Sequence, residues 1–249
     1  CADLIKKIWD AVAEEHKDLV LIKKGGNEAA IELAEDEGIA LFSATGSCDM
    51  GKALAPKVAK RLGRSLLELG GNNAAIVCKS ADIDLTVKGI TFAAAGTTGQ
   101  RCTTLRRLFV HSDIHEVVLT KLKKAFKALK IGDPMDRSTQ VGPLISEQSF
   151  NQMQEKLVSC KSKGLAVTGG ERIDHAKEVY VTPAIVETNK HIEEMHEETF
   201  APILYVMPFT DLKEAVSLQN SVRQGLSSSI FTNDVRESEF FLGPEGSDC

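Results

Sequence analysis

The sequence predicts an α/β fold built on a parallel sheet. Short apolar runs of strand length, such as residues 74–78 and 203–207, alternate along the chain with amphipathic stretches of helical length. Glycine pairs and helix-capping side chains lie between them. Alternation of strand and helix is typical of parallel strands joined by helical crossovers.

In the first half of the chain, four apolar runs are expected to form strands: residues 19–22, 39–42, 65–69 and 74–78. Amphipathic spacing predicts helices over residues 27–37, 49–62 and 82–95. Asn27 is expected to cap the first of these helices. The glycine pairs at 25–26 and 70–71 turn the chain between elements.

The second half continues the pattern with longer helices, which are predicted over residues 116–129, 146–163 and 212–219. Strands are expected at residues 107–111, 184–187, 203–207 and 228–231, and the run 165–168 enters a turn at 169–170. Glycine density rises at residues 96–99. We therefore place a domain boundary there, which divides the chain into residues 1–99 and 100–249.

The composition is that of a globular protein and excludes several classes. Hydrophobic residues make up 43% of the 249 positions, and the formal net charge is −5. The chain has no basic run that would suggest nucleic-acid or membrane-surface partners. It also has no apolar stretch near the roughly 18 residues that a membrane span needs. Neither kind of partner is expected.

The cysteines indicate free thiols rather than a scaffold. Six cysteines are too few for a disulfide framework in a chain of this length, and none lies in a Cys-x-x-Cys pair. We therefore expect no bound metal and a reducing compartment. The chain begins at Cys1 without an initiator methionine and ends at Cys249.

Thr45, Gly46 and Ser47 form a candidate anion site, because they lie between an expected strand and an expected helix. Free N–H groups and the helix dipole attract phosphate at such a position. The alternative is that Ser47 simply caps the helix, and spacing alone favours this alternative.

Cys102 differs from the other cysteines in its neighbours, which read Gly-Thr-Thr-Gly-Gln-Arg before it and Thr-Thr after it. The thiolate is the reactive form of cysteine, and an adjacent arginine such as Arg101 can favour it. Cys78 lies in an apolar run and is expected to be buried and inert, whereas Cys48, at a helix start, is the main rival. From spacing alone, a structural role is commoner for any one of them.

Glu68 is a candidate general base, since it stands within an apolar strand that ends in two glycines. A partly dehydrated carboxylate can act as a base near neutral pH. The alternative is a strand-end glutamate that faces water. The pair Glu197 and Glu198 precedes Phe200, and its alternative is likewise solvated surface. His191 and His196 fall in an acidic segment and are predicted to face solvent.

Four segments taken in order resemble the aldehyde dehydrogenase superfamily: Thr45-Gly46-Ser47, Glu68-Leu69-Gly70-Gly71, Gly99-Gln100-Arg101-Cys102 and Glu198-Thr199-Phe200-Ala201-Pro202. Within the superfamily, the residues of these segments are most similar to those of the antiquitin type, the α-aminoadipic semialdehyde dehydrogenases. The similarity runs from about residue 19 to the end of the chain. Each motif alone is weak, whereas four in the same order are unlikely to arise by chance.

The resemblance implies a partial Rossmann-like NAD-binding domain over residues 1–99, followed by an α/β catalytic domain over residues 100–249. It implies that Cys102 attacks the aldehyde to give a thiohemiacetal, that hydride transfer leaves a thioester, and that Glu68 activates the hydrolytic water. It also implies that Arg101 pairs with a distal carboxylate of the substrate. The remaining implied residues bind NAD: Thr45, Gly46 and Ser47 near the pyrophosphate, Leu69 and Gly70, and Glu198 with Phe200 at the nicotinamide ribose.

The implied activity is the NAD-dependent oxidation of an aldehyde to a carboxylic acid, with α-aminoadipic semialdehyde of lysine catabolism as the expected substrate. Alternatives are another aldehyde, such as betaine aldehyde or a lipid-derived aldehyde, and an inactive fragment or pseudoenzyme. The resemblance also implies a small-molecule partner, a homotetramer or homodimer, and a cytoplasmic or mitochondrial location.

The sequence departs from the family at both ends. No segment matches the family's N-terminal portion, which carries the oxyanion-binding asparagine, or its C-terminal anchor loop and oligomerisation strand. Ala44 stands where phenylalanine is usual. We therefore expect the chain to be a central fragment that is poorly soluble or inactive by itself.

Overall fold

A computed structural model describes residues 1–173 and 178–249 of the chain. The chain forms two compact units, Cys1–Leu69 and Gly70–Cys249. The division falls between β2 and β3, earlier than the glycine-rich boundary expected at residues 96–99. The reason is that the helix over residues 83–95 packs on the same sheet as the elements that follow it. The assignment of NAD-binding and catalytic domains stays a prediction.

The first unit has a small parallel sheet with a helical cover. Its elements in order are α1 (Ala2–Val12), the 3₁₀ helix η1 (Glu14–Leu19), α2 (Asn27–Glu35), β1 (Leu41–Thr45), α3 (Cys48–Lys60) and β2 (Arg64–Glu68). Strands β1 and β2 pair in parallel. Ala34 of α2, Phe42 of β1 and Leu54 and Val58 of α3 form the core of this unit.

The apolar run 19–22 does not form the expected strand. Leu19 ends η1, and the segment up to α2 has no regular structure. Leu19 and Leu21 are 73% and 83% exposed. An isolated extended segment leaves its backbone polar groups without a ladder partner, and the sheet of this unit pairs β1 with β2 alone. The prediction for this run was therefore wrong.

The second unit is a mixed α/β layer structure. Its helices are α4 (Ile83–Ala95), η2 (Gly96–Gly99), α5 (His115–Lys127), α6 (Glu147–Ser162), η3 (Glu193–His196), α7 (Leu212–Gln219) and α8 (Val235–Leu242). Its strands are β3 (Ala74–Val77), β4 (Arg107–His111), β5 (Ala166–Thr168), β6 (Arg172–Ile173), β7 (Tyr180–Val181), β8 (Ala184–Glu187), β9 (Ile203–Phe209) and β10 (Ser228–Phe231).

Six of these strands form one sheet in the order β10-β3-β4-β9-β8-β5. All neighbouring pairs in it are parallel except β5 with β8. The α/β prediction is therefore confirmed. The short pair β6–β7 and the helices α1 and α8 were not predicted. Two-residue strands carry too little periodicity to be recognised in a sequence.

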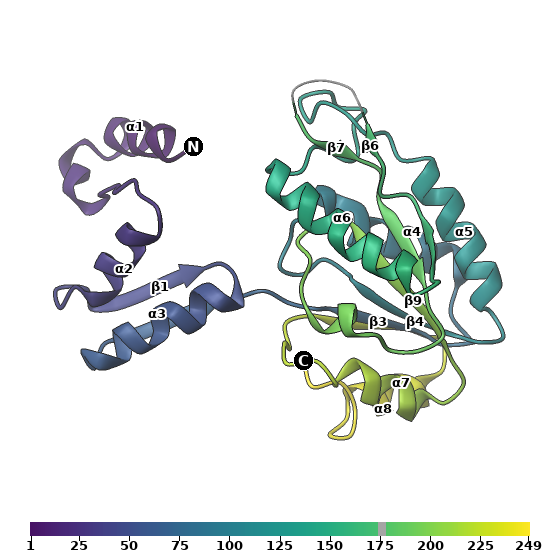
Figure 1. The fold of residues 1–249 in the computed structure, drawn as a ribbon. Coiled ribbons are helices and arrows are strands. Elements are labelled where there is room, and N and C mark those ends of the chain that lie inside the picture. Colours follow the sequence, from purple (N-terminus) through teal and green to yellow (C-terminus); the bar gives the residue numbers. More distant parts are fainter. Residues whose placement is uncertain (174–177) are drawn as a thin grey trace. The chain divides into compact units, whose positions relative to one another are not determined.

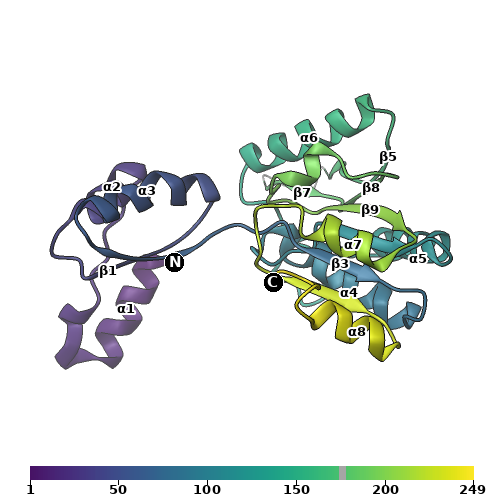
Figure 2. The same ribbon diagram turned by 90° about the horizontal axis from the view of Figure 1, so that it is seen from below.

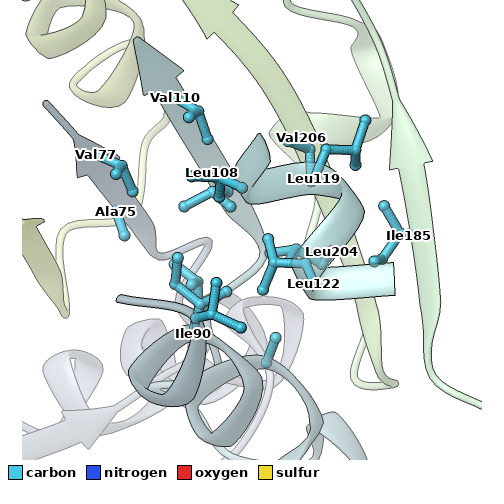
Figure 3. Close-up of a cluster of buried hydrophobic side chains, with 14 of the residues drawn as sticks. Ala75, Val77, Ile90, Leu108, Val110, Leu119, Leu122, Ile185, Leu204 and Val206 are labelled. Atoms are coloured by element: carbon cyan, nitrogen blue, oxygen red, sulfur yellow. The ribbon is translucent and has the colours of Figure 1, made fainter. Parts of the chain in front are cut away.

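Helices α4 and α5 cover one face of this sheet. Figure 3 shows Ile90 of α4 and Leu119 and Leu122 of α5 in one buried cluster with side chains of the strands, where Leu122 lies beside Leu204 and Leu119 beside Val206. This cluster fixes the end of α4, and therefore the start of the turn at residues 96–102 that follows it.

The opposite face is covered by α6 over β8 and β9, and by α7 and α8 over β3 and β4. Figure 1 shows α6 on the side away from α4 and α5, and Figure 2 shows α7 next to β3 and β9. His191 lies on the segment after β8 and is half-buried, so the prediction that it faces solvent was wrong, whereas His196 is exposed.

Membrane-spanning helices and clusters of metal-binding side chains are both missing from the described residues. Across 1–173 and 178–249, we find no helix with the length and apolar character needed to cross a bilayer. The same residues contain no group of three or more His, Cys, Asp or Glu side chains placed to hold a metal ion.

Candidate active site

In the first unit, the candidate residues gather at the carboxyl ends of β1 and β2. The parallel register sets Thr45 opposite Glu68. The Gly46 N–H donates to the Glu68 carbonyl at 3.0 Å, which ties the turn after β1 to the end of β2. Carboxyl ends of parallel strands meet at one edge of a sheet, so two motifs that are distant in sequence become neighbours.

Ser47 caps α3, because its Oγ accepts a hydrogen bond from the Met50 N–H at 3.1 Å. Asp49 adds a negative charge in the first turn, where it interacts favourably with the helix dipole and weakens the attraction of this helix start for phosphate. The capping interpretation of Ser47 is therefore met by the structure. A phosphate contact of Thr45, Gly46 or Ser47 stays a prediction.

Glu68 is exposed within its unit, which corrects the expectation of a partly dehydrated carboxylate there. Side chains alternate along a strand, and Phe42 and Leu67 face the core of the unit. Glu68 and Leu66 therefore point to the other face, where both are exposed. Leu69, in contrast, packs close to Gly51 of α3, where an added Cβ would lie 2.6 Å from its methyl group.

In the second unit, Glu198 closes over the glycine pair that begins it. A Cβ at Gly70 would lie 1.9 Å from Glu198 Oε2, so only glycine permits this approach. The Gly71 N–H donates to Glu198 Oε1 at 3.3 Å. The Glu198 side chain is 15% exposed, which makes it neither solvated surface nor fully buried.

Cys102 lies on a strained turn after α4. Thr97 and Thr98 adopt left-handed backbone conformations with φ of 55° and 56°. Such angles are costly for β-branched residues and persist only where the surroundings hold them. Gly99 follows at φ 66°, and a Cβ there would lie 2.4 Å from the Ala201 backbone. The turn therefore packs against the segment that carries Glu198.

The Asn73 side chain holds two backbone carbonyl groups of the turn that carries Cys102. Its Nδ2 donates to the Cys102 carbonyl at 2.7 Å and to the Thr104 carbonyl at 2.9 Å. Cys102 itself is exposed. Its backbone is thus held while its thiol stays accessible.

The other thiols have different surroundings. Cys78 is 1% exposed, and loss of water raises its pKa to about 12. Burial also raises the pKa of Cys160. The expectation that Cys78 is buried is therefore confirmed. Cys48, the expected rival, is half-buried at the first residue of α3, and Cys1 and Cys249 are exposed at the chain ends.

Arg101 binds the end of α4. Its Nη2 donates to the Phe92 carbonyl at 2.8 Å, and its guanidinium lies over the Phe92 ring at 4.8 Å. Phe92 and Gly96 both line a largely apolar pocket of about 510 Å³ between α4 and α5. Arg101 therefore lies at the border of this pocket, where it satisfies a carbonyl group at the end of the helix.

Arg106 is the residue that sequence reasoning missed. Its side chain is 2% exposed and pairs with Glu198 at 3.0 Å. Burial lowers its pKa from the ordinary value, and the Glu198 carboxylate opposes that shift. The ring of Phe200, which is 43% exposed, lies 5.7 Å from the guanidinium carbon. The sequence signal for this residue was the pair of arginines, Arg106 and Arg107, at the start of an apolar run. Charged side chains in such a position need partners inside the protein.

The structure thus assembles the candidate residues in two groups. Thr45, Gly46, Ser47, Glu68 and Leu69 come together in the first unit. In the second, Glu198, Phe200 and the Arg101 carbonyl contact Arg106, Gly70 lies against Glu198, and Cys102 follows Arg101 on the same turn. The pairing of Glu68 with Cys102 stays a prediction.

Comparison with known proteins gives a family match over most of the chain. A profile of the aldehyde dehydrogenase family matches residues 2–243. The α-aminoadipic semialdehyde dehydrogenase of Mus musculus is 46% identical over 227 residues, which are 90% of this chain and 42% of that protein. The protein of the same name from Bos taurus is 43% identical over 249 residues, covering 98% of this chain and 46% of its own length.

Solved structures agree with the fold. Lactaldehyde dehydrogenase from Escherichia coli superposes with a TM-score of 0.85 at 32% identity, covering 92% of this chain and 50% of that one. Betaine aldehyde dehydrogenase from Staphylococcus aureus, solved in complex with NAD⁺, gives 0.84 at 27% identity, covering 88% and 44%. The chain spans less than half the length of the two curated relatives above.

Proposed function

This chain belongs to the aldehyde dehydrogenase family, and we propose that it carries the nucleophile and part of the NAD site of an enzyme that oxidises an aldehyde to a carboxylic acid. The observation that carries the proposal is the second-unit group. An exposed cysteine on a fixed turn and the Glu198 segment share one buried arginine, and the two segments are packed in direct contact.

In this proposal Cys102 forms the covalent bond. Its thiolate attacks the aldehyde carbon, a C–S bond forms, and the carbonyl electron pair moves onto oxygen. NAD, which Glu198, Gly70 and Phe200 would hold, would supply the acceptor for the hydride of that carbon, so that a thioester would remain on the Cys102 sulfur. Water then attacks the thioester, the C–S bond breaks, and the acid leaves. A covalent thioester divides a difficult oxidation into easier steps.

The second-unit residues fit NAD at Glu198. A carboxylate that is largely dry yet 15% exposed can accept a hydrogen bond from a ribose hydroxyl. The missing side chain at Gly70 leaves the backbone open to close approach. Phe200 offers an exposed aromatic face beside this carboxylate for a planar ring.

First-unit residues supply the rest of the proposal. Glu68 takes the proton of the hydrolytic water, and Leu69 and the turn of Thr45, Gly46 and Ser47 complete the cofactor site. Glu68 and this turn share the carboxyl edge of β1 and β2, where ligands bind in open parallel sheets.

We propose α-aminoadipic semialdehyde as the substrate. Curated relatives at 43–46% identity bear that name. Arg101, next to Cys102 in sequence, supplies a cation suited to the distal carboxylate of this aldehyde. Betaine aldehyde carries a fixed positive charge, which the same arginine would repel.

The first test is thiol labelling of this chain. Iodoacetamide should modify Cys102 well ahead of the buried Cys78 and Cys160, and a C102S variant should lose that adduct in a peptide map. Cys1 and Cys249, which are also exposed, serve as accessible reference thiols. Labelling of Cys102 no faster than Cys1 and Cys249 would argue against an activated nucleophile.

The second test is turnover of the whole protein that contains this chain. NADH formation should be faster with aminoadipate semialdehyde than with betaine aldehyde, and C102S or E68Q should abolish it. R101Q should raise KM for the carboxylate-bearing aldehyde by about tenfold and leave a neutral aldehyde nearly unchanged. An equal effect of R101Q on both aldehydes would contradict the substrate assignment.

A further inference from the structure

We propose that Arg106 is a positioning residue that holds the Glu198 carboxylate and the Cys102 turn in one fixed arrangement. The proposal rests on the proposed function, because it assigns a role to the group that surrounds those two residues. Neither the family comparison nor the four motifs point to this arginine.

The contacts of Arg106 reach three separate segments. From the glycine pair, the Gly71 carbonyl accepts from its Nε at 3.3 Å. From the Glu198 segment, the Thr199 carbonyl accepts from Nη1 at 2.5 Å, and Glu198 Oε1 accepts from Nη2 at 3.0 Å.

The third segment is the Cys102 turn. The Arg101 carbonyl accepts from Nη2 at 3.4 Å, and the Gly99 carbonyl accepts from Nη1 at 3.5 Å. All three nitrogens of one guanidinium are therefore used, and none of the three segments neighbours another in sequence. A planar fork with several donors can hold such an arrangement, whereas the single ammonium of lysine cannot.

The charges of this arrangement are interdependent. The guanidinium and the Glu198 carboxylate are both largely removed from water. Removing one partner of a buried ion pair leaves the other charge uncompensated, which is more damaging than removing both. The same guanidinium bonds to the carbonyl of Arg101, one residue before the proposed nucleophile, so the position of the Cys102 turn depends on this ion pair.

Arg107 provides a matched control. It follows Arg106 directly as the first residue of β4 and is equally buried, at 1% exposed, but it donates to the carbonyl groups of Asn72, Leu218 and Gln219. Leu218 and Gln219 form the end of α7. Arg107 therefore stabilises a helix terminus on the other side of the strand and does not contact the turn of Cys102 or Glu198 in these hydrogen bonds.

The experiment compares R106Q with R107Q in this chain, with R106K measured in the same way in case R106Q does not fold. Both glutamine variants should lower the unfolding midpoint. Only the Arg106 variants should slow alkylation of Cys102 at pH 7, by about tenfold for R106Q and less for R106K.

A double-mutant cycle with E198Q provides a readout that a merely structural arginine would not change. The loss of stability caused by R106Q, or by R106K where that is used, should be smaller in the E198Q background, because no uncompensated carboxylate remains. R107Q should show no such coupling to E198Q. Equal effects of R106Q and R107Q on alkylation, or no coupling to E198Q, would overturn the proposal.

Failure of the proposal for Arg106 can be distinguished from failure of the proposed function. If Cys102 in the unsubstituted chain reacts no faster than Cys1 and Cys249, the proposed nucleophile is wrong. In that case the E198Q cycle still decides whether Arg106 holds Glu198.

Discussion

His191 illustrates how burial changes a single titratable side chain. Loss of water lowers its pKa to about 4, and the positive charges of Arg107 and His196 act in the same direction. Its ring stands edge-on to that of His196 at 4.6 Å. An unfolded histidine titrates near 6.5, so between these two values the unfolded chain binds a proton that the folded chain does not.

We therefore expect stability to fall as the pH drops from about 6.5 to 4. The contribution of His191 should be on the order of 1 kcal/mol, since the ring is only half-buried and water screens part of the effect. Urea unfolding from neutral pH down to about pH 4.5 measures it. H191Q should flatten this dependence.

The exposed His16 supplies the control for this measurement. H16Q should keep the pH dependence of the unsubstituted chain. A steeper loss of stability in H191Q at acidic pH than in the unsubstituted chain would contradict the predicted sign.

Single-residue features differ in how far the sequence reveals them. The inertness of Cys78 follows from its apolar neighbours, and the structure confirms its burial. The exposure of Glu68 could not be decided, because strand periodicity indicates two faces without saying which one a helix covers. Arg106 was hidden because its partners lie in three segments that only the fold brings together.

At the scale of elements, the end of α3 carries an unfavourable residue. The Gly63 N–H bonds to the Val58 carbonyl and the Leu62 N–H to the Ala59 carbonyl, which is the Schellman pattern of a helix C-terminus. This pattern needs a left-handed residue, and Leu62 occupies that position at φ 58° while 94% exposed. Glycine is the usual residue there, and here it comes one position later.

We expect L62G to stabilise the first unit by about 1 kcal/mol, because glycine removes the backbone strain and the lost side chain makes little contact. Thermal unfolding followed by far-UV circular dichroism measures the change. K60G, at the last residue of α3, should lower the stability of the first unit by a similar amount. A lower midpoint for L62G would show that the left-handed conformation costs little at this site.

Helices and strands were predicted well where the hydrophobic pattern of a segment agrees with the neighbouring element that it packs against. Residues 107–111 and 212–219 form a strand and a helix with the predicted bounds. The helix predicted over residues 49–62 is longer at its C-terminus than the observed α3, which ends at Lys60. The glycine that usually signals a helix C-terminus comes one position late here, after Leu62. The run 19–22 had strand composition without a strand to pair with, and pairing is what decides a strand.

At the scale of the whole molecule, the two units differ in the amount of core. The first unit rests on one cluster of four buried side chains, whereas the second contains three larger clusters on both faces of its sheet. Strands β1 and β2 each have one neighbour, while β3, β4 and β9 are central strands. Local opening is easiest where few apolar contacts protect the backbone.

Amide hydrogen exchange should therefore be at least about 100-fold faster in β1 and β2 than in β4 and β9. Mass spectrometry of peptides from the labelled chain measures this difference. The edge strand β10 is the internal control and should fall between the two groups. Equal protection of β1 and β4 would show that the small core of the first unit is supported by contacts beyond it.

Adjacent residues on an extended backbone point to opposite sides, and the guanidinium groups of Arg106 and Arg107 accordingly reach different segments. The carbonyl of Asn73 accepts the N–H groups of both residues, at 3.1 Å each. A shift of one residue in the pairing of β4 with β3 would exchange the destinations of the two guanidinium groups. The register between these two strands therefore decides which arginine reaches the carboxylate.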